Sequence, residues 1–440
     1  MSSPLTVPES TVLDACGETP IPRFGTIEQL WETDPIPEHG IGNHVDRAVA
    51  DLSLDRIPDG GSVALGVGSR GINALPILVE GAVRAFRDRG YDPFVFPAMG
   101  SHGGATADGQ RGKLAALGVT EESVGCRIES SMEVLEVGRT PERDVPVYTD
   151  ETAMGADAIV PINRIKPHTD FSGAVESGLS KMLVIGMGNQ PGAKTAHTWA
   201  VDWSFRNMIP EITGLLLERL PIAGGIAVVE DQHDETTIVE GIPPEGFLDR
   251  EAELLERAYE LLPRIPFDEL DLLVIDRMGK DVSGPGMDPN VIGRMVYGLN
   301  EPAPERPEVK RIYTRSLTEP SHGNAVGLGL ADFVHEELVE AMNPSKTLIN
   351  ALTASTPRGV RVPPVLETDR AGVVAGLSTI GVVDPDSVRV ARIRDTMHLK
   401  RLVVSEALVE RAREREDLRV VGEPEALAFE DGRLPPFPEG

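Results

Sequence analysis

Two histidines and a lysine that could take part in catalysis or ligand binding lie between residues 166 and 197. His168 ends the run Lys166-Pro167-His168, and Lys181 lies in the segment Glu176-Ser177-Gly178-Leu179-Ser180-Lys181-Met182. His197 follows that lysine after sixteen residues. Neutral imidazole binds transition metals and exchanges protons near pH 7, and a lysine amine can become a covalent anchor. These residue types together indicate an enzyme site.

Two further candidates lie in earlier glycine-rich turns. Arg70 is in Gly68-Ser69-Arg70-Gly71, and His102 is in Gly100-Ser101-His102-Gly103-Gly104. A guanidinium matches a carboxylate or phosphate, and flanking glycines let a ligand approach the backbone. The alternatives are an ion pair for Arg70 and a helix-capping role for His102.

The elements before these turns predict a parallel α/β arrangement. Short apolar runs at 62–67, 93–98 and 156–161 read as strands, and the first two are followed by helical patterns at 73–89 and 105–117, with Asn73 as an N-cap. Parallel sheets place binding residues at the carboxyl ends of their strands. Arg70, His102 and His168 are therefore expected at one edge of one sheet.

The second half of the chain predicts another α/β domain. The Pro263–Pro266 stretch indicates a boundary between domain 1–265, which carries the His and Lys motifs, and domain 266–440, which closes a cleft over the active site. The tail from Gly432 is expected to be loose, or to pack back on the first domain. Predicted elements here are a strand at 272–276, helices at 330–342, 369–380 and 404–416, and a strand at 388–393.

Composition narrows the class of protein. The 440 residues carry a formal net charge of −28 and contain eight lysines against thirty-four arginines. Such a surface repels nucleic acid and anionic membrane, and it suits concentrated salt, so we expect a halophilic source; an acidic mesophile protein from a GC-rich genome is the alternative. With no apolar run of about eighteen residues, no visible signal peptide and only Cys16 and Cys126, we expect a cytoplasmic protein.

The ordered set of motifs resembles the nickel-pincer lactate racemase family, in particular its less characterised branch. The shared pieces are GSRG (68–71), GSHG (100–103), KPHTDF (166–171), ESGLSKMLVIGMG (176–188) with His197, GKDVSGPGMDPNVIGR (279–294) and LTEPSHGNAVGLGLADF (317–333). The loop at 279–286 lacks the spacing of a P-loop. The chain departs from the characterised racemases at Ser69-Arg70-Gly71, which bears on substrate size. It also has a longer stretch from His168 to Lys181, which bears on the pose of His168.

The resemblance implies a cofactor and a role for each candidate. Lys181 would carry the nickel-pincer nucleotide covalently, and His197 would be the protein ligand of its nickel. His102 and His168 would be paired acid/base groups, with Arg70 holding the substrate carboxylate or the cofactor. The remaining residues expected to bind the cofactor are Ser69, Ser177, Gly178, and either or both of Lys280 and Arg294.

The implied reaction is racemisation or epimerisation of a small 2-hydroxy acid through reversible hydride transfer to the cofactor. The implied partners are cofactor-biosynthesis proteins, and a homodimer is an open possibility. Three alternatives stay open: a sugar-acid (aldonate) epimerase on the same cofactor, a cofactor- or ligand-binding protein without turnover, and a zinc hydrolase that uses His102, His168 and His197. A core role for His197 and a functional role for His322, which lies next to Gly323, also stay open.

Overall fold

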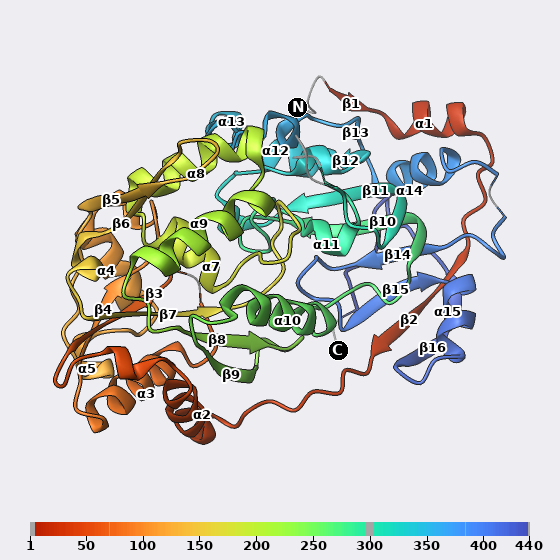
Figure 1. Cartoon of the computed structure of the whole chain (residues 1–440). Helices are drawn as coiled ribbons and strands as arrows, with labels where there is room; N and C mark the ends of the chain where they lie inside the picture. Colours follow the sequence, from red (N-terminus) through yellow and green to blue (C-terminus); the bar gives the residue numbers. More distant parts are fainter. Residues whose placement is uncertain (1–4, 70, 296–301, 383, 439–440) are drawn as a thin grey trace. The chain divides into compact units, whose positions relative to one another are not determined.

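The computed structural model describes residues 5–69, 71–295, 302–382 and 384–438, and the chain divides into two compact units (Figure 1). The inserted unit is Thr33–Leu262, and the split unit combines Met1–Glu32 with Pro263–Gly440. Residues 1–32 therefore do not belong to the first domain, contrary to the expected boundary of 1–265. The reason is strand pairing, because β1 (Thr6–Val7) pairs with β13 (Val365–Leu366) and β2 (Arg23–Gln29) pairs with two late strands.

The inserted unit is built on one five-stranded sheet. Its order is β4 (Asp92–Pro97), β3 (Ser62–Val67), β7 (Ala158–Arg164), β8 (Gly225–Glu230) and β9 (Thr236–Ile242). The first four strands are parallel and β9 is antiparallel to β8. A short antiparallel pair, β5 (Val134–Arg139) and β6 (Pro146–Asp150), forms a separate ribbon.

Alternating side chains of this sheet face two apolar layers. Val63, Leu65 and Val67 of β3 pack with the helices on one face, including α2 and α3. Ala64 faces the other layer, where α7, α9 and α10 supply buried side chains. The helices of the unit are α2 (Glu38–Ala50), α3 (Leu75–Asp88), α4 (Ala107–Ala116), α5 (Glu121–Val124), α6 (Glu151–Met154), α7 (Leu179–Lys181) with the π-helical turn η3 (Met182–Gly186), α8 (Asn189–Trp203), α9 (Phe205–Arg219) and α10 (Phe247–Glu260).

The split unit is built on a nine-stranded sheet. Its order is β1, β13, β12 (Phe333–His335), β11 (Glu308–Leu317), β10 (Glu269–Met278), β14 (Val390–Ile393), β15 (Arg401–Ser405), β2 and β16 (Leu418–Ala426). Pairing is parallel from β1 to β14 and antiparallel from β14 to β16. Its helices are α1 (Glu9–Cys16), α11 (Pro289–Ile292), α12 (Glu336–Ala341), α13 (Pro344–Thr353), α14 (Asp369–Ser378) and α15 (Glu406–Arg413). Both sheets are mainly parallel, so the predicted α/β class is confirmed.

Three local expectations were wrong. The helix expected at 330–342 begins only at Glu336, because β12 occupies Phe333–His335, and the helix expected at 404–416 begins after β15. Asn73 does not cap α3: the cap position is Ala74, and the Asn73 amide donates to the Glu230 carboxylate.

The tail is held within the split unit. The Leu434 amide donates to Asp369 at 2.8 Å, and the Arg392 guanidinium donates to the Pro435 carbonyl at 2.7 Å. Both contacts lie within the split unit, so Leu434 and Pro435 are held there and are not loose. Within the described ranges, no helix has the length and apolar character needed to span a membrane.

Candidate functional site

Two of the candidate histidines of the inserted unit, His102 and His168, lie in loops that follow strands β4 and β7. The sheet has a topological switch point between β3 and β7. From β3 the chain passes to β4 on one side, and the next strand of the sheet, β7, lies on the other side of β3. Loops that leave neighbouring parallel strands in opposite directions open a crevice at the carboxyl edge, where α/β proteins bind ligands. His102 follows β4, Ser69 follows β3 and His168 follows β7, as the sequence predicted.

The loop of His102 is fixed by buried contacts. The Ser69 hydroxyl contacts Nδ1 of His102, which joins the turns after β3 and β4. The Gly100 amide donates to the Gly186 carbonyl at 2.9 Å, and the buried Gln110 side chain donates to the Gly100 carbonyl at 2.8 Å. Gly100 has a φ of 60°, and a Cβ there would lie 3.2 Å from the Ile185 carbonyl oxygen. The glycine therefore lets this loop lie against the turn that follows Lys181.

The turn after β3 is anchored at its far end. The Asn73 amide donates to Glu230 at 2.6 Å, and Glu230 also pairs with Arg164. Burial raises the pKa of the Glu230 carboxyl, while Arg164 and the Asn73 amide act in the opposite direction. Arg70, the predicted anion ligand of this turn, lies outside the described residues.

His168 is held in one tautomer by its own loop. The Asp170 backbone amide donates to Nδ1 of His168 at 3.0 Å. An amide can only donate, so Nδ1 must be the acceptor, and the neutral ring carries its proton on Nε2. His102 differs, because a serine hydroxyl can either donate to its Nδ1 or accept from it.

A buried carboxylate fixes the His168 loop. Glu176 accepts from the His168 amide, from the Gly173 amide at 3.0 Å and from the Tyr259 hydroxyl at 2.9 Å. It is 1% exposed. Burial raises the pKa of Glu176, while these hydrogen bonds and the charge of Lys181 act to lower it. The Glu176 carboxylate is therefore the charge neighbour of Lys181 as well as the anchor of the loop.

Lys181 lies in a turn that a second buried carboxylate holds. The Ser180 amide donates to both oxygens of Glu251, at 3.2 and 3.0 Å, and the Ser180 hydroxyl donates to it too. A Cβ on Gly178 would lie 2.1 Å from the Glu251 Oε1 atom, so only glycine admits the carboxylate. The Ser177 carbonyl accepts from the Lys166 amide at 2.9 Å, which ties the same segment to the end of β7.

His197 is the residue that the sequence analysis expects to bind the metal. It lies on α8, and its side chain is exposed, so an incoming group can reach the imidazole. Desolvation by the protein around it, then the charges of Lys181 and His102, lower the pKa of His197. A lowered pKa favours the neutral ring, which is the form that binds a metal ion. The electrostatic effect of Lys181 and His102 therefore reaches His197.

An aromatic series connects His197 to His168. The His168 ring lies 4.5 Å from the ring of Phe171, which lies 5.4 Å from Phe205, which in turn meets His197 edge-on at 5.2 Å, all between ring centroids. Phe171 is completely buried. The series therefore connects the two histidines through apolar rings.

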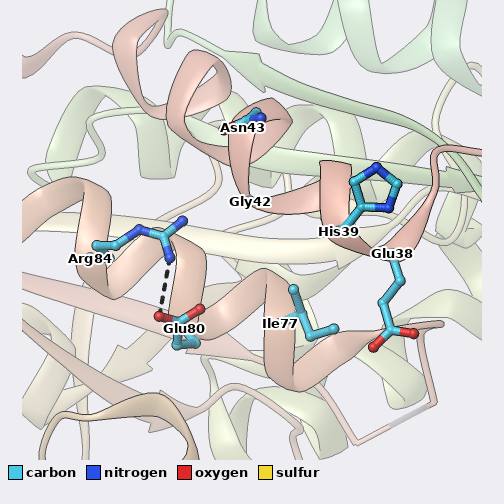
Figure 2. Close-up of a pocket in the computed structure, with 7 residues that line it drawn as sticks. All are labelled: Glu38, His39, Gly42, Asn43, Ile77, Glu80 and Arg84. Carbon is cyan, nitrogen blue, oxygen red and sulfur yellow. Dashed lines mark hydrogen bonds and ion pairs between the residues drawn. The ribbon is translucent and has the colours of Figure 1, made fainter.

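Two further observations concern metal binding and a groove away from the predicted site residues. In the ranges that the structure describes, no group of three or more His, Cys, Asp or Glu side chains is placed to hold a metal ion. A surface groove of about 490 Å³ lies between α2 and α3, with Arg84 paired to Glu80 at 3.3 Å (Figure 2). None of the predicted site residues lines it; its lining residues are Glu38, His39, Gly42, Asn43, Ile77, Glu80 and Arg84.

Three residues that the sequence analysis singled out for a functional role lie in the split unit. Lys280 donates through its ammonium group to the Gly284 carbonyl. The Arg294 guanidinium pairs with Asp332 at 2.7 Å and also donates to the carbonyl oxygens of Leu330, Val309 and Lys310, so it braces the sheet edge. His322 is exposed and has a φ of 48°.

Sequence reasoning missed the supporting residues Glu251, Tyr259 and Phe205. Glu251 had a detectable signal, because it occupies the apolar stripe of α10 together with Phe247, Leu254, Leu255 and Ala258. An acidic residue at such a position is buried and needs donors. The sequence alone does not say that those donors come from Ser180.

Similarity to known proteins is found among solved structures. No family model matches the sequence, and no curated protein matches it. Among solved structures, the lactate racemase apoprotein from Thermoanaerobacterium thermosaccharolyticum is similar, with 13% sequence identity, a TM-score of 0.46, and coverage of 85% of this chain and 88% of that chain. A likeness at that TM-score supports no inference about the function of this chain.

Proposed function

We propose that the inserted unit carries the active site of a 2-hydroxy-acid racemase or epimerase, with a nickel-pincer nucleotide attached to Lys181 and its nickel bound by His197. The observation that carries the proposal is the grouping of one lysine and two imidazoles at the switch point of the sheet. The charges of Lys181 and His102 both act to lower the pKa of His197, which supports this grouping.

The residues present fit such a group. A covalent anchor needs an amine that is held in place, and the turn of Lys181 is fixed by the contact of Ser180 with Glu251. A single protein ligand needs a neutral, reachable imidazole, and His197 is exposed with a lowered pKa. When bound, the nucleotide would supply a hydride acceptor, which neither Lys181 nor His197 can provide.

The chain's own residues then handle the substrate proton. If the Ser69 hydroxyl accepts from Nδ1 of His102, Nε2 of that ring carries a lone pair and can take the proton of the substrate hydroxyl. His168 presents the opposite state, an Nε2–H that donates to a substrate oxygen. With that tautomer of His102, the two histidines begin with complementary roles, one as acceptor and one as donor.

Full proton exchange at His168 requires a movement. A doubly protonated ring would direct Nδ1–H at the Asp170 amide N–H, so the ring must turn away before it becomes charged. We therefore infer that His102 is the principal base, and that His168 depends on the mobility of residues 168–173.

The test uses protein coexpressed with a nickel-pincer biosynthetic system. Native mass spectrometry should show one covalent adduct and one nickel ion per chain, both lost in Lys181→Ala. Lys194→Ala, which removes an exposed lysine of α8, should keep both. His197→Ala should keep the adduct and lose the nickel.

Activity is assayed by chiral chromatography on a panel from lactate to aldonates. An adduct-free wild-type protein that binds zinc and hydrolyses esters would replace the proposal with the hydrolase. A protein with neither adduct nor metal nor turnover would leave a binding protein.

A further inference from the structure

The helix α10 contacts both segments that carry chemistry in the inserted unit. Glu251 reaches the turn of Lys181 through Ser180, and Tyr259, eight residues later on the same helix, reaches the loop of His168 through Glu176. Figure 1 shows α10 as one continuous helix after β9. It supplies no group that touches substrate in the proposed reaction.

Among the described contacts of the Lys181 turn, the hydrogen-bond acceptor for its first amide groups is Glu251. Gly178 precedes the turn and cannot cap it with a side chain, so the first amides of α7 require acceptors from elsewhere. The Ser180 amide and hydroxyl donate to Glu251, and the Leu179 amide also acts on this carboxyl. All of these groups are buried.

The local sequence is consistent with this contact. Replacing the hydrogen of Gly178 by a methyl group would place carbon 2.1 Å from one oxygen of Glu251 and 3.2 Å from its Cδ atom. The carboxylate lies on the backbone where a side chain would otherwise be. Burial raises the pKa of Glu251 to about 7, against a usual 4.5. This makes a carboxyl a costly choice for a purely structural contact.

We infer that Glu251 is a positioning residue for Lys181. Its carboxylate fixes the backbone of Ser180, and the position of this backbone sets the direction in which the Lys181 side chain extends from the turn. The inference rests on the proposed function only for the use made of the amine. Tyr259 and Glu176 hold the other side of the same segment, so the lysine turn is tied to α10 at both ends.

The experiment measures the reactivity of the amine, not turnover. The full chain is trace-acylated with acetic anhydride, and peptide mapping gives the labelling ratio of Lys181 to Lys194, which lies on α8 of the same molecule. In Glu251→Ala the turn loses its acceptor, and the half-buried lysine should label about threefold faster or more relative to Lys194. Glu251→Gln retains one acceptor oxygen and should fall between.

Matched variants separate positioning from general damage. Glu256→Gln makes the same change of charge at an exposed site of α10 and should leave the ratio unchanged. Ser180→Ala removes only the hydroxyl contact and should give a smaller rise, which keeps the test decisive if Glu251→Ala does not fold. General destabilisation would lower the melting temperature without moving the ratio.

The result that overturns the inference is a wild-type ratio in Glu251→Gln and Ser180→Ala at native melting temperatures. Adduct mass is measured on the same samples. If the wild-type chain takes up no adduct, the proposed function fails, while the labelling ratio still decides the role of Glu251.

Discussion

Glu251 should make the inserted unit less stable as the pH rises. The folded state holds the carboxyl proton up to a pKa of about 7, whereas the unfolded chain loses it near the usual 4.5. Between these values the folded state binds more protons, so the free energy of unfolding falls as the pH rises through this window. Below pH 4.5 the cost is absent, and above pH 7 it is complete.

The size of the effect follows from the two pKa values. Each pH unit between them corresponds to about 1.4 kcal/mol, so ionised Glu251 costs the fold about 3 kcal/mol. Glu251→Gln cannot ionise and escapes this cost. Relative to wild type, its free energy of unfolding should therefore improve by about 2–3 kcal/mol from pH 5 to pH 8. Other buried carboxyls, such as Glu176 and Glu230, are common to both proteins and cancel.

The assay must report the inserted unit alone. The chain has three tryptophans, of which Trp199 and Trp203 lie in α8 and Trp31 lies in the split unit. Urea titrations in a Trp31→Phe background therefore follow the inserted unit by tryptophan emission, at constant ionic strength.

Glu256→Gln serves as the control for a change of charge on the same helix. A Glu251→Gln effect that is equal at both pH values, to within about 0.5 kcal/mol, would refute the reasoning.

Three further outcomes are expected. Gly178→Ala should destabilise the inserted unit by about 2 kcal/mol or more, since its methyl group meets the Glu251 carboxylate; an unchanged urea midpoint would contradict this. Nitrogen-15 NMR of the neutral His168 ring should show the proton on Nε2, and a protonated Nδ1 would show that the Asp170 contact is absent in solution. The melting temperature should rise from low to molar KCl, as screening relieves the repulsion of the −28 charge, and a flat or falling curve would remove the halophile hypothesis.

The sequence predicted which residues follow the carboxyl ends of the strands, but it did not predict the contacts that hold these residues in place. Glycine turns after apolar runs are local signals, and they placed His102 and His168 after β4 and β7, where the structure has them. By contrast, β12 has only three residues and depends on its neighbours in the sheet, so its sequence read as part of a helix.

The support of the site was not predictable in the same way. Ser180 and Glu251 are 71 residues apart, and Ser69 and His102 are 33 apart. Such pairings follow from the fold and leave no periodicity in the chain. The tautomer of His168 depends on one amide two residues away, a contact that loop conformation decides.

The pairing of β2 has a consequence for synthesis on the ribosome. This strand, at residues 23–29, has both of its partners at the other end of the chain, β15 at 401–405 and β16 at 418–426. At about 5–20 residues per second, roughly 20 to 70 seconds pass before the first partner emerges. The inserted unit is complete in sequence long before then. β2 is therefore translated well before either of its partners, and its two unpaired edges are open to other nascent chains during that interval.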